Sequence, residues 1–194
     1  MTRARYPDID ETALTPRQRE VYDAIVAGPR GQVVGPLRVW LHSPELADRA
    51  QALGGFARYG TALPPILSEL AILVTARIWS SEFEWSHHAP IAERAGLDPA
   101  VIDAIARGAR PVFGDPAQKA VFDAAVELHR DRAMTDVTYA AALAALGLTA
   151  LVELVGICGY YTLISMTINV FEVPGDDGPR LPQIDVPAEQ MFRD

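Results

Sequence analysis

Apolar and polar positions along the chain recur at the spacing of helices. Leu46, Ala50 and Leu53, for example, lie three and four residues apart, which places them on one face of a helix. Almost no stretch alternates residue by residue as a half-buried strand does. The pattern therefore predicts an all-α fold.

Caps and breakers divide the chain into helices of ordinary length. Thr15 before Pro16 is typical of a helix start, as are the later Ser-Pro and Asp-Pro pairs. Glycines mark several ends. We expect Gly54 and Gly55 to end one helix, and Gly147 to separate the last two. The predicted helices cover residues 16–27, 44–53, 66–79, 80–95, 99–108, 116–130, 136–146 and 148–173.

A length of 194 residues fits one domain. We expect a single helical domain over residues 1–173, in which residues 1–60 extend a core at 60–173. Residues 174–194 contain four prolines and little apolar repetition, so we expect an extended tail that is loose or lies on a neighbouring subunit.

Composition excludes several classes of function. Lysine and arginine number 17 against 25 aspartates and glutamates, a net charge of −8 that would repel nucleic acid. The single cysteine, Cys158, allows no internal disulfide, no thiolate zinc site and no Cys-x-x-Cys redox centre. The first residues contain no apolar run of the kind a signal peptide uses, which predicts a cytoplasmic protein.

Residues 154–171 form an 18-residue run without a charge, at the threshold length for a membrane-spanning helix. Polar residues such as Thr162, Ser165 and Asn169 interrupt the run, and acidic residues flank it. We interpret it as a buried or subunit-interface helix, with no membrane partner.

The densest polar cluster is the segment from Ser81 to His88. Ser81, Glu84 and His88 are spaced to share one helical face, so a carboxylate and an imidazole lie side by side. Glu84 can hold one ring nitrogen of His88 and leave the other free to give or take a proton. Glu69 would join them if its helix and the next pack as a hairpin.

Plainer interpretations of the same residues stay open. Ser81 and Glu84 also fit a capping box, which would use both side chains on backbone N–H groups. A metal site on Glu84, His87 and His88 is a weaker alternative, because adjacent histidines diverge on a helix, and we predict none. His42 and His129 are expected at the surface, and Cys158 as a small buried residue.

Two segments carry a family resemblance. The run from Glu69 to Leu97 and the run from Leu151 to Val173 resemble the carboxymuconolactone decarboxylase family, within the alkylhydroperoxidase D-like superfamily. The likeness spans about residues 60–175. It implies an alkylhydroperoxidase D-like helical bundle that forms a homo-oligomer, commonly a trimer or hexamer, with sites near subunit contacts.

The peroxidase branch of that superfamily has a glutamate, two cysteines and a histidine at the positions held here by Glu69, Ser81, Glu84 and His88. The spacing is kept, but both cysteines are absent. Reduction of a hydroperoxide by that route needs a thiolate to attack and a second thiol to resolve, so we do not expect peroxidase activity.

The decarboxylase branch implies decarboxylation or proton transfer, without a cofactor, on a small carboxylated lactone or unsaturated keto acid. We expect Glu69, Glu84 and His88 to be catalytic, with Ser81, His87 and Arg77 as substrate-binding candidates. Arg94 is a second candidate for the cation that an acidic substrate needs. The alternatives are a catalytically silent oligomeric module that binds a small ligand, and residual thiol chemistry at Cys158.

Overall fold

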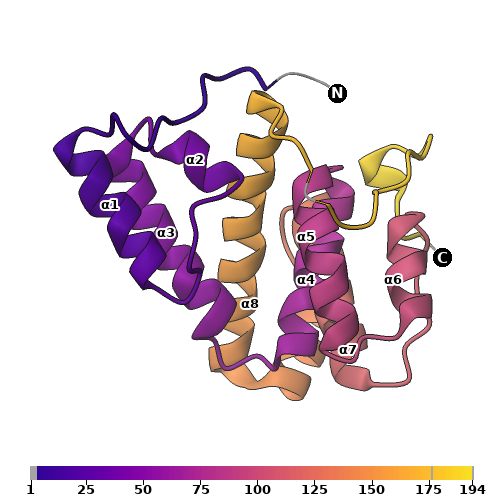
Figure 1. The fold of residues 1–194 in the computed structure, drawn as a ribbon. Helices are drawn as coiled ribbons and strands as arrows, with labels where there is room; N and C mark the ends of the chain where they lie inside the picture. Colours follow the sequence, from indigo (N-terminus) through magenta and orange to yellow (C-terminus); the bar gives the residue numbers. More distant parts are fainter. Residues whose placement is uncertain (1–3, 176, 194) are drawn as a thin grey trace.

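The computed structural model describes residues 4–175 and 177–193 and confirms the all-α prediction (Figure 1). No strand occurs in this part of the chain. Its elements are α1 (Pro16–Ala27), α2 (Pro36–Trp40), α3 (Pro44–Tyr59), α4 (Pro65–Ile78), α5 (Glu82–Arg94), α6 (Pro99–Ala106), α7 (Pro116–Arg130), α8 (Asp136–Phe171) and the 3₁₀ helix η1 (Ala188–Gln190).

Most helix starts lie where local capping chemistry predicts them. Thr15 forms a full capping box with Gln18, and the side chains of Asp98, Asp115 and Thr135 each accept a hydrogen bond from a backbone N–H in the first turn. Such signals need no tertiary contact, which explains why these boundaries could be predicted.

Two predictions about the first sixty residues were wrong. The short helix α2 was not expected, since five residues are too few to show a helical period. The two glycines at 54 and 55 do not end α3, which continues to Tyr59. Gly54 is instead a packing position, because a Cβ there would lie 2.0 Å from the hydroxyl oxygen of Tyr160.

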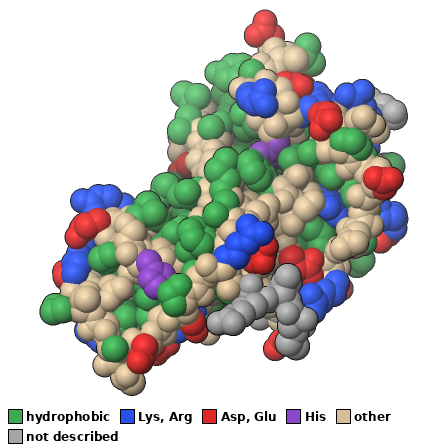
Figure 2. Space-filling view, turned by 90° about the horizontal axis from the view of Figure 1, so that it is seen from above, with side chains coloured by type: hydrophobic (Ala, Val, Ile, Leu, Met, Phe, Trp, Pro, Cys, Tyr) green, Lys and Arg blue, Asp and Glu red, His purple; other side chains and the backbone are tan. Residues whose placement is uncertain are grey.

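Helix α8 lies between two groups of helices (Figure 1). The N-terminal helices α1–α3 cover one side of α8, and α4–α7 cover the other. Every residue of α4 from Leu67 to Arg77 is buried, so α4 is the centre of the larger group. Seen from above, hydrophobic side chains form a band across the middle of the molecule (Figure 2).

Gly147 divides α8 as predicted. Its φ of 77° and ψ of 166° are non-helical, and the positive φ is one that glycine adopts without steric cost. The apolar part that follows has the length and composition of a membrane-spanning helix, with 33% of its most apolar window buried. It packs in the protein against α3, α4 and α7.

The described part of the tail is extended and mostly exposed, but it is anchored to the chain at a few points, which the expectation of a loose tail did not include. An arm on a neighbouring subunit stays a prediction. Leu181, Met191 and Phe192 are buried against the same chain. The backbone N–H of Phe192 donates to the carbonyl of Gly108 at 2.8 Å. These buried residues are too widely spaced to form a periodic apolar pattern, so the sequence did not predict their burial.

Candidate functional site

Helices α4 and α5 bring Glu69, Glu84 and His88 into direct contact. Nδ1 of His88 lies 2.7 Å from Oε2 of Glu69, and Nε2 of His88 lies 3.3 Å from Oε2 of Glu84. All three side chains are buried, with at most 5% of each residue exposed. The arrangement is a carboxylate–imidazole–carboxylate line that crosses from one helix to the other.

The two carboxylates control the charge of His88. Burial on its own would lower the pKa of the imidazole, because it disfavours the charged form. Glu69 acts through its charge and hydrogen bond, and Glu84 acts in the same way; together they outweigh burial and raise the pKa to about 9. At neutral pH the ring is therefore an imidazolium that holds a proton between two acids.

This geometry corrects the expected division of roles. We expected Glu84 to orient the ring and leave the other nitrogen free, but both ring nitrogens face a carboxylate. Glu69 has the orienting position, since it makes the short hydrogen bond at Nδ1. Glu84 and His88 line the cavity described below, and Glu69 does not.

Ser81 does not behave as the capping-box alternative requires. It is the N-cap residue of α5, yet its side chain makes no cap hydrogen bond. Its hydroxyl is fully buried and has no hydrogen-bond partner among the described residues. Ser81 also lies outside the lining of the cavity described below, which gives no support to its expected role in substrate binding.

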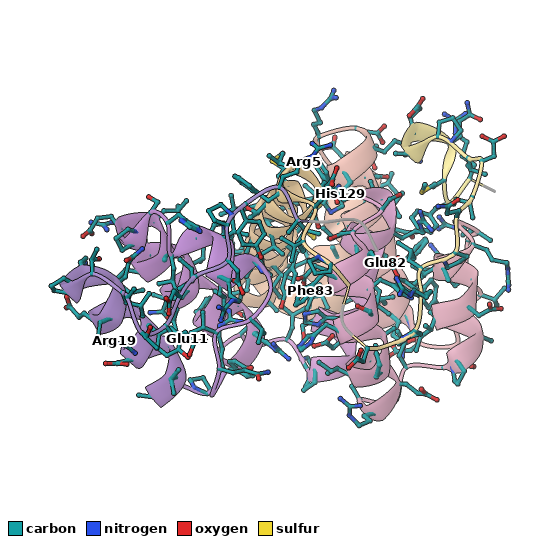
Figure 3. All side chains as sticks on the ribbon, turned by 45° about the horizontal axis from the view of Figure 1, so that its top comes forward. Arg5, Glu11, Arg19, Glu82, Phe83 and His129 are labelled. Carbon is teal, nitrogen blue, oxygen red and sulfur yellow. The ribbon has the colours of Figure 1, made fainter. Side chains whose placement is uncertain are left out.

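A cavity of about 50 Å³ adjoins this line. It has room for roughly four waters, which corresponds to a compact organic acid. Phe83 of α5, labelled in Figure 3, faces the N-terminal part of the chain, where its ring meets Gly35, and forms part of the cavity wall. The lining consists of Arg30, Gln32, Val34, Pro36, Leu37, Arg58, Phe83, Glu84, His87, His88, Tyr160, Tyr161 and Ile164.

His87 lines the cavity, as the substrate-binding expectation requires. Its ring stacks on Phe83 with the two planes 4° apart, and its Nε2 lies 3.0 Å from Nη2 of Arg58. Because a guanidinium only donates, Nε2 of His87 is the acceptor in this contact. The stacking and this contact hold the ring of His87 in place beside His88.

Arg77 lies outside the cavity, which gives no support to its predicted contact with substrate. Its guanidinium is buried and donates to the carbonyls of Ala106 and Pro182 and to the hydroxyl of Ser80. Burial lowers its pKa from the usual value for arginine. Arg77 thus connects the C-terminal tail to the core. Arg94, the other candidate, is exposed and lies outside the cavity.

The sequence alone did not single out the two arginines that do line the cavity, Arg30 and Arg58. Nor did it single out Tyr160 and Tyr161, although a tyrosine pair in an otherwise apolar helix was a visible signal. The ring of Tyr161 stands edge-on to His88 with centroids 5.1 Å apart. Burial, with the nearby carboxylates, raises the pKa of Tyr161, so its hydroxyl stays protonated.

Comparison with known proteins agrees with the fold and with the motif that carries the site. Residues 44–127 match the model of the carboxymuconolactone decarboxylase family. The family resemblance is confirmed. The line of Glu69, Glu84 and His88 lies wholly inside the matched segment, whereas Arg30 and the tyrosine pair lie outside it.

A solved structure shares the fold of this carboxymuconolactone decarboxylase-like chain. It is the crystal structure of an uncharacterized peroxidase-related protein from Silicibacter sp. TM1040. That chain is 13% identical, with a TM-score of 0.69 over 91% of this chain and 96% of its own. A likeness at this identity shows the fold alone. No curated protein matches the sequence.

Thiol chemistry has no support at the site. Cys158 is buried and does not line the cavity, and burial raises the pKa of its thiol to about 12. His129 was expected at the surface, but it is partly buried with its Nε2 2.9 Å from Oγ1 of Thr75. Among residues 4–175 and 177–193, no group of three or more histidine, cysteine, aspartate or glutamate side chains is arranged to hold a metal ion.

Proposed function

We propose that the protein catalyses decarboxylation, or a related proton transfer, on a small carboxylated lactone or unsaturated keto acid without a cofactor. The observation that carries the proposal is the imidazolium of His88, held between Glu69 and Glu84 at the wall of a compact cavity. A pKa of about 9 suits a general acid at neutral pH, because the proton is present and still transferable.

The reaction needs a proton at carbon after carbon dioxide leaves. When the bond to the carboxylate breaks, its electron pair moves into the conjugated carbonyl of the substrate and forms an enolate. His88 then supplies a proton to the carbon, directly or through Glu84, and regains one from water. One proton is consumed for each carbon dioxide released. Glu69 holds the ring and stabilises its charge, so it is a positioning residue.

The size of the cavity orders the candidate substrates. About 50 Å³ admits compact acids as it stands, and a larger lactone requires part of the cavity wall to move. Among the substrates of the proposed class, we therefore expect small unsaturated keto acids to have the lower KM.

The test is ultraviolet-monitored decay of γ-carboxymuconolactone and a panel of smaller unsaturated keto acids. Glu84→Gln and His88→Ala should each lower kcat by about 100-fold or more, as loss of a general acid does. Glu82→Gln and His42→Ala are matched controls, because both residues lie outside the cavity. Wild-type rates in His88→Ala, or no turnover by the wild type, would overturn the proposal. Hydroperoxide serves as the negative control substrate.

We also infer that the chain self-associates as a trimer or hexamer. Leu53 and Phe56 of α3 and Leu148 and Val152 of α8 line an exposed apolar groove, and Leu148 and Val152 are each more than 60% exposed. Clustered apolar side chains of this kind mark association sites. Light scattering should give an oligomeric mass for the wild type and a lower mass for Val152→Glu. A monomeric wild type would refute this inference.

A further inference from the structure

Two arginines face the cavity without a carboxylate partner among the described residues. Nη2 of Arg30 lies 3.2 Å from the hydroxyl oxygen of Tyr160, and Nη2 of Arg58 lies 3.0 Å from Nε2 of His87. By contrast, Arg17 and Arg38 each bind two or more carboxylates at the surface. The Nε of Arg30 is buried and has no hydrogen-bond acceptor in the part of the chain that is described.

A buried donor without an acceptor is costly, so its presence in a cavity indicates a group that arrives from solution. Arginine presents its donors as a planar fork that matches a carboxylate. Glu69 and Glu84 both face the ring of His88, whereas Arg30 and Arg58 have no carboxylate partner among the described residues. A bound carboxylate would supply one.

Two glycines let the backbone approach the side chains of the cavity wall closely. A Cβ on Gly54 would lie 2.0 Å from the hydroxyl oxygen of Tyr160 and 2.4 Å from Nη2 of Arg30. The bare backbone of α3 thus lets the two side chains pack against it. Gly35, with a φ of 56°, approaches the ring of Phe83 in the same way, and a Cβ there would lie 2.3 Å from Cζ.

We propose that Arg30 and Arg58 form a carboxylate-binding subsite that holds the substrate by a carboxylate other than the one it loses. The proposal rests on the proposed function. Arg30 and Arg58 line the same small cavity, so one ligand can reach both of them.

The bound carboxylate is the non-reacting one for an energetic reason. The departing carboxylate loses its negative charge as the bond to carbon breaks. An arginine bound to it would stabilise the ground state more than the transition state and slow the reaction. An arginine on a second carboxylate stabilises both states equally and positions the substrate. The subsite thus selects acids that carry two carboxylates.

The test uses succinate, a compact dicarboxylate, with its uncharged dimethyl ester as the matched ligand. Titration calorimetry on the full chain should show that succinate binds the wild type and that the ester does not. Arg30→Gln and Arg58→Gln should each raise the Kd for succinate at least tenfold, and Arg58→Lys should recover part of the loss. Arg94→Gln is the control, because Arg94 is exposed and outside the cavity.

The subsite is overturned if the wild type does not bind succinate, if the ester binds equally, or if both glutamine variants keep the wild-type Kd. Arg58→Gln keeps the test valid if Arg30→Gln fails to fold, since only Arg30 of the two approaches the Gly54 backbone. Binding is measured without turnover. If the arginine variants lose succinate binding but the wild type decarboxylates no substrate, the subsite is sustained and the proposed function is refuted. If the variants keep the wild-type Kd and the wild type is active, the subsite is refuted and the proposed function is sustained.

Discussion

Oε2 of Glu69 lies 2.7 Å from Nδ1 of His88, although nineteen residues separate them in the chain. The contact joins α4 to α5 inside the core, where neither residue is more than 5% exposed. A charged hydrogen bond in such a place both fixes the ring and raises its proton affinity. Replacing Glu69 with glutamine removes the charge and keeps a hydrogen-bond acceptor.

Glu69→Gln should move the pH dependence of the reaction. Glutamine can still accept a hydrogen bond at Nδ1, but it removes the charge that raises the pKa of His88. We expect the alkaline limb of the kcat profile, near pH 9 in the wild type, to shift to lower pH, with kcat at neutral pH reduced about tenfold or more. Glu93→Gln on the exposed face of α5 is the control. An unshifted limb would remove Glu69 from the mechanism.

Two histidines should give the stability curve a maximum near pH 6.5. The pKa of His88 is about 9, so its contribution is complete below 6.5 and is lost as pH rises through 9. Burial lowers the pKa of His129 to about 4, so its contribution is complete above 6.5 and is lost as pH falls through 4.

Each limb should amount to roughly 2–3 kcal/mol in the free energy of unfolding. Urea unfolding between pH 4 and pH 10 measures it. His129→Gln should flatten the acid limb alone, and His88→Gln should flatten the alkaline limb alone. If either variant leaves its limb as steep as in the wild type, the corresponding assignment is wrong.

The two adjacent glycines of α3 should respond in opposite directions to alanine. Gly54→Ala forces a methyl group against Tyr160 and Arg30 and should cost about 1–3 kcal/mol of stability. Gly55 has no atom within 4 Å of the Cβ position, so Gly55→Ala should gain roughly 0.5–1 kcal/mol through helix propensity. Thermal melts of both variants decide the point. Equal effects would contradict the packing assigned to Gly54.

The C-terminal tail should contribute strongly to stability. Phe192 is 2% exposed and packs edge-on against Phe122 with ring centroids 5.3 Å apart. Phe192→Ala should therefore cost about 3–5 kcal/mol, as a buried phenylalanine does. Arg193→Ala at the neighbouring exposed position should cost little. A melting temperature unchanged by Phe192→Ala would support the loose tail instead.

The sequence predicted those features that depend on near neighbours. Thr15, Asp98 and Asp115 mark helix starts through bonds within one turn, and Glu84 and His88 meet because they lie four residues apart on α5. Glu69 could be anticipated only through the hairpin of α4 and α5.

The remaining site residues depend on contacts between distant segments. Arg30 and Arg58 look like any surface arginine until α3 packs on α8 and Tyr160 reaches the backbone of Gly54. Arg77 looked like a substrate ligand because nothing local reveals that the carbonyl of Pro182, 105 residues away, returns to it. Tertiary packing, rather than local propensity, decides such cases.

The residues that line the cavity lie only partly within the segment that matches the family model. Glu84 and His88 lie within residues 44–127, whereas Arg30, Gln32 and Val34 precede that segment and Tyr160 follows it. Two chains can therefore match the family model equally well and still differ in the shape of the cavity. The ligand that fits depends in part on segments that the model does not cover.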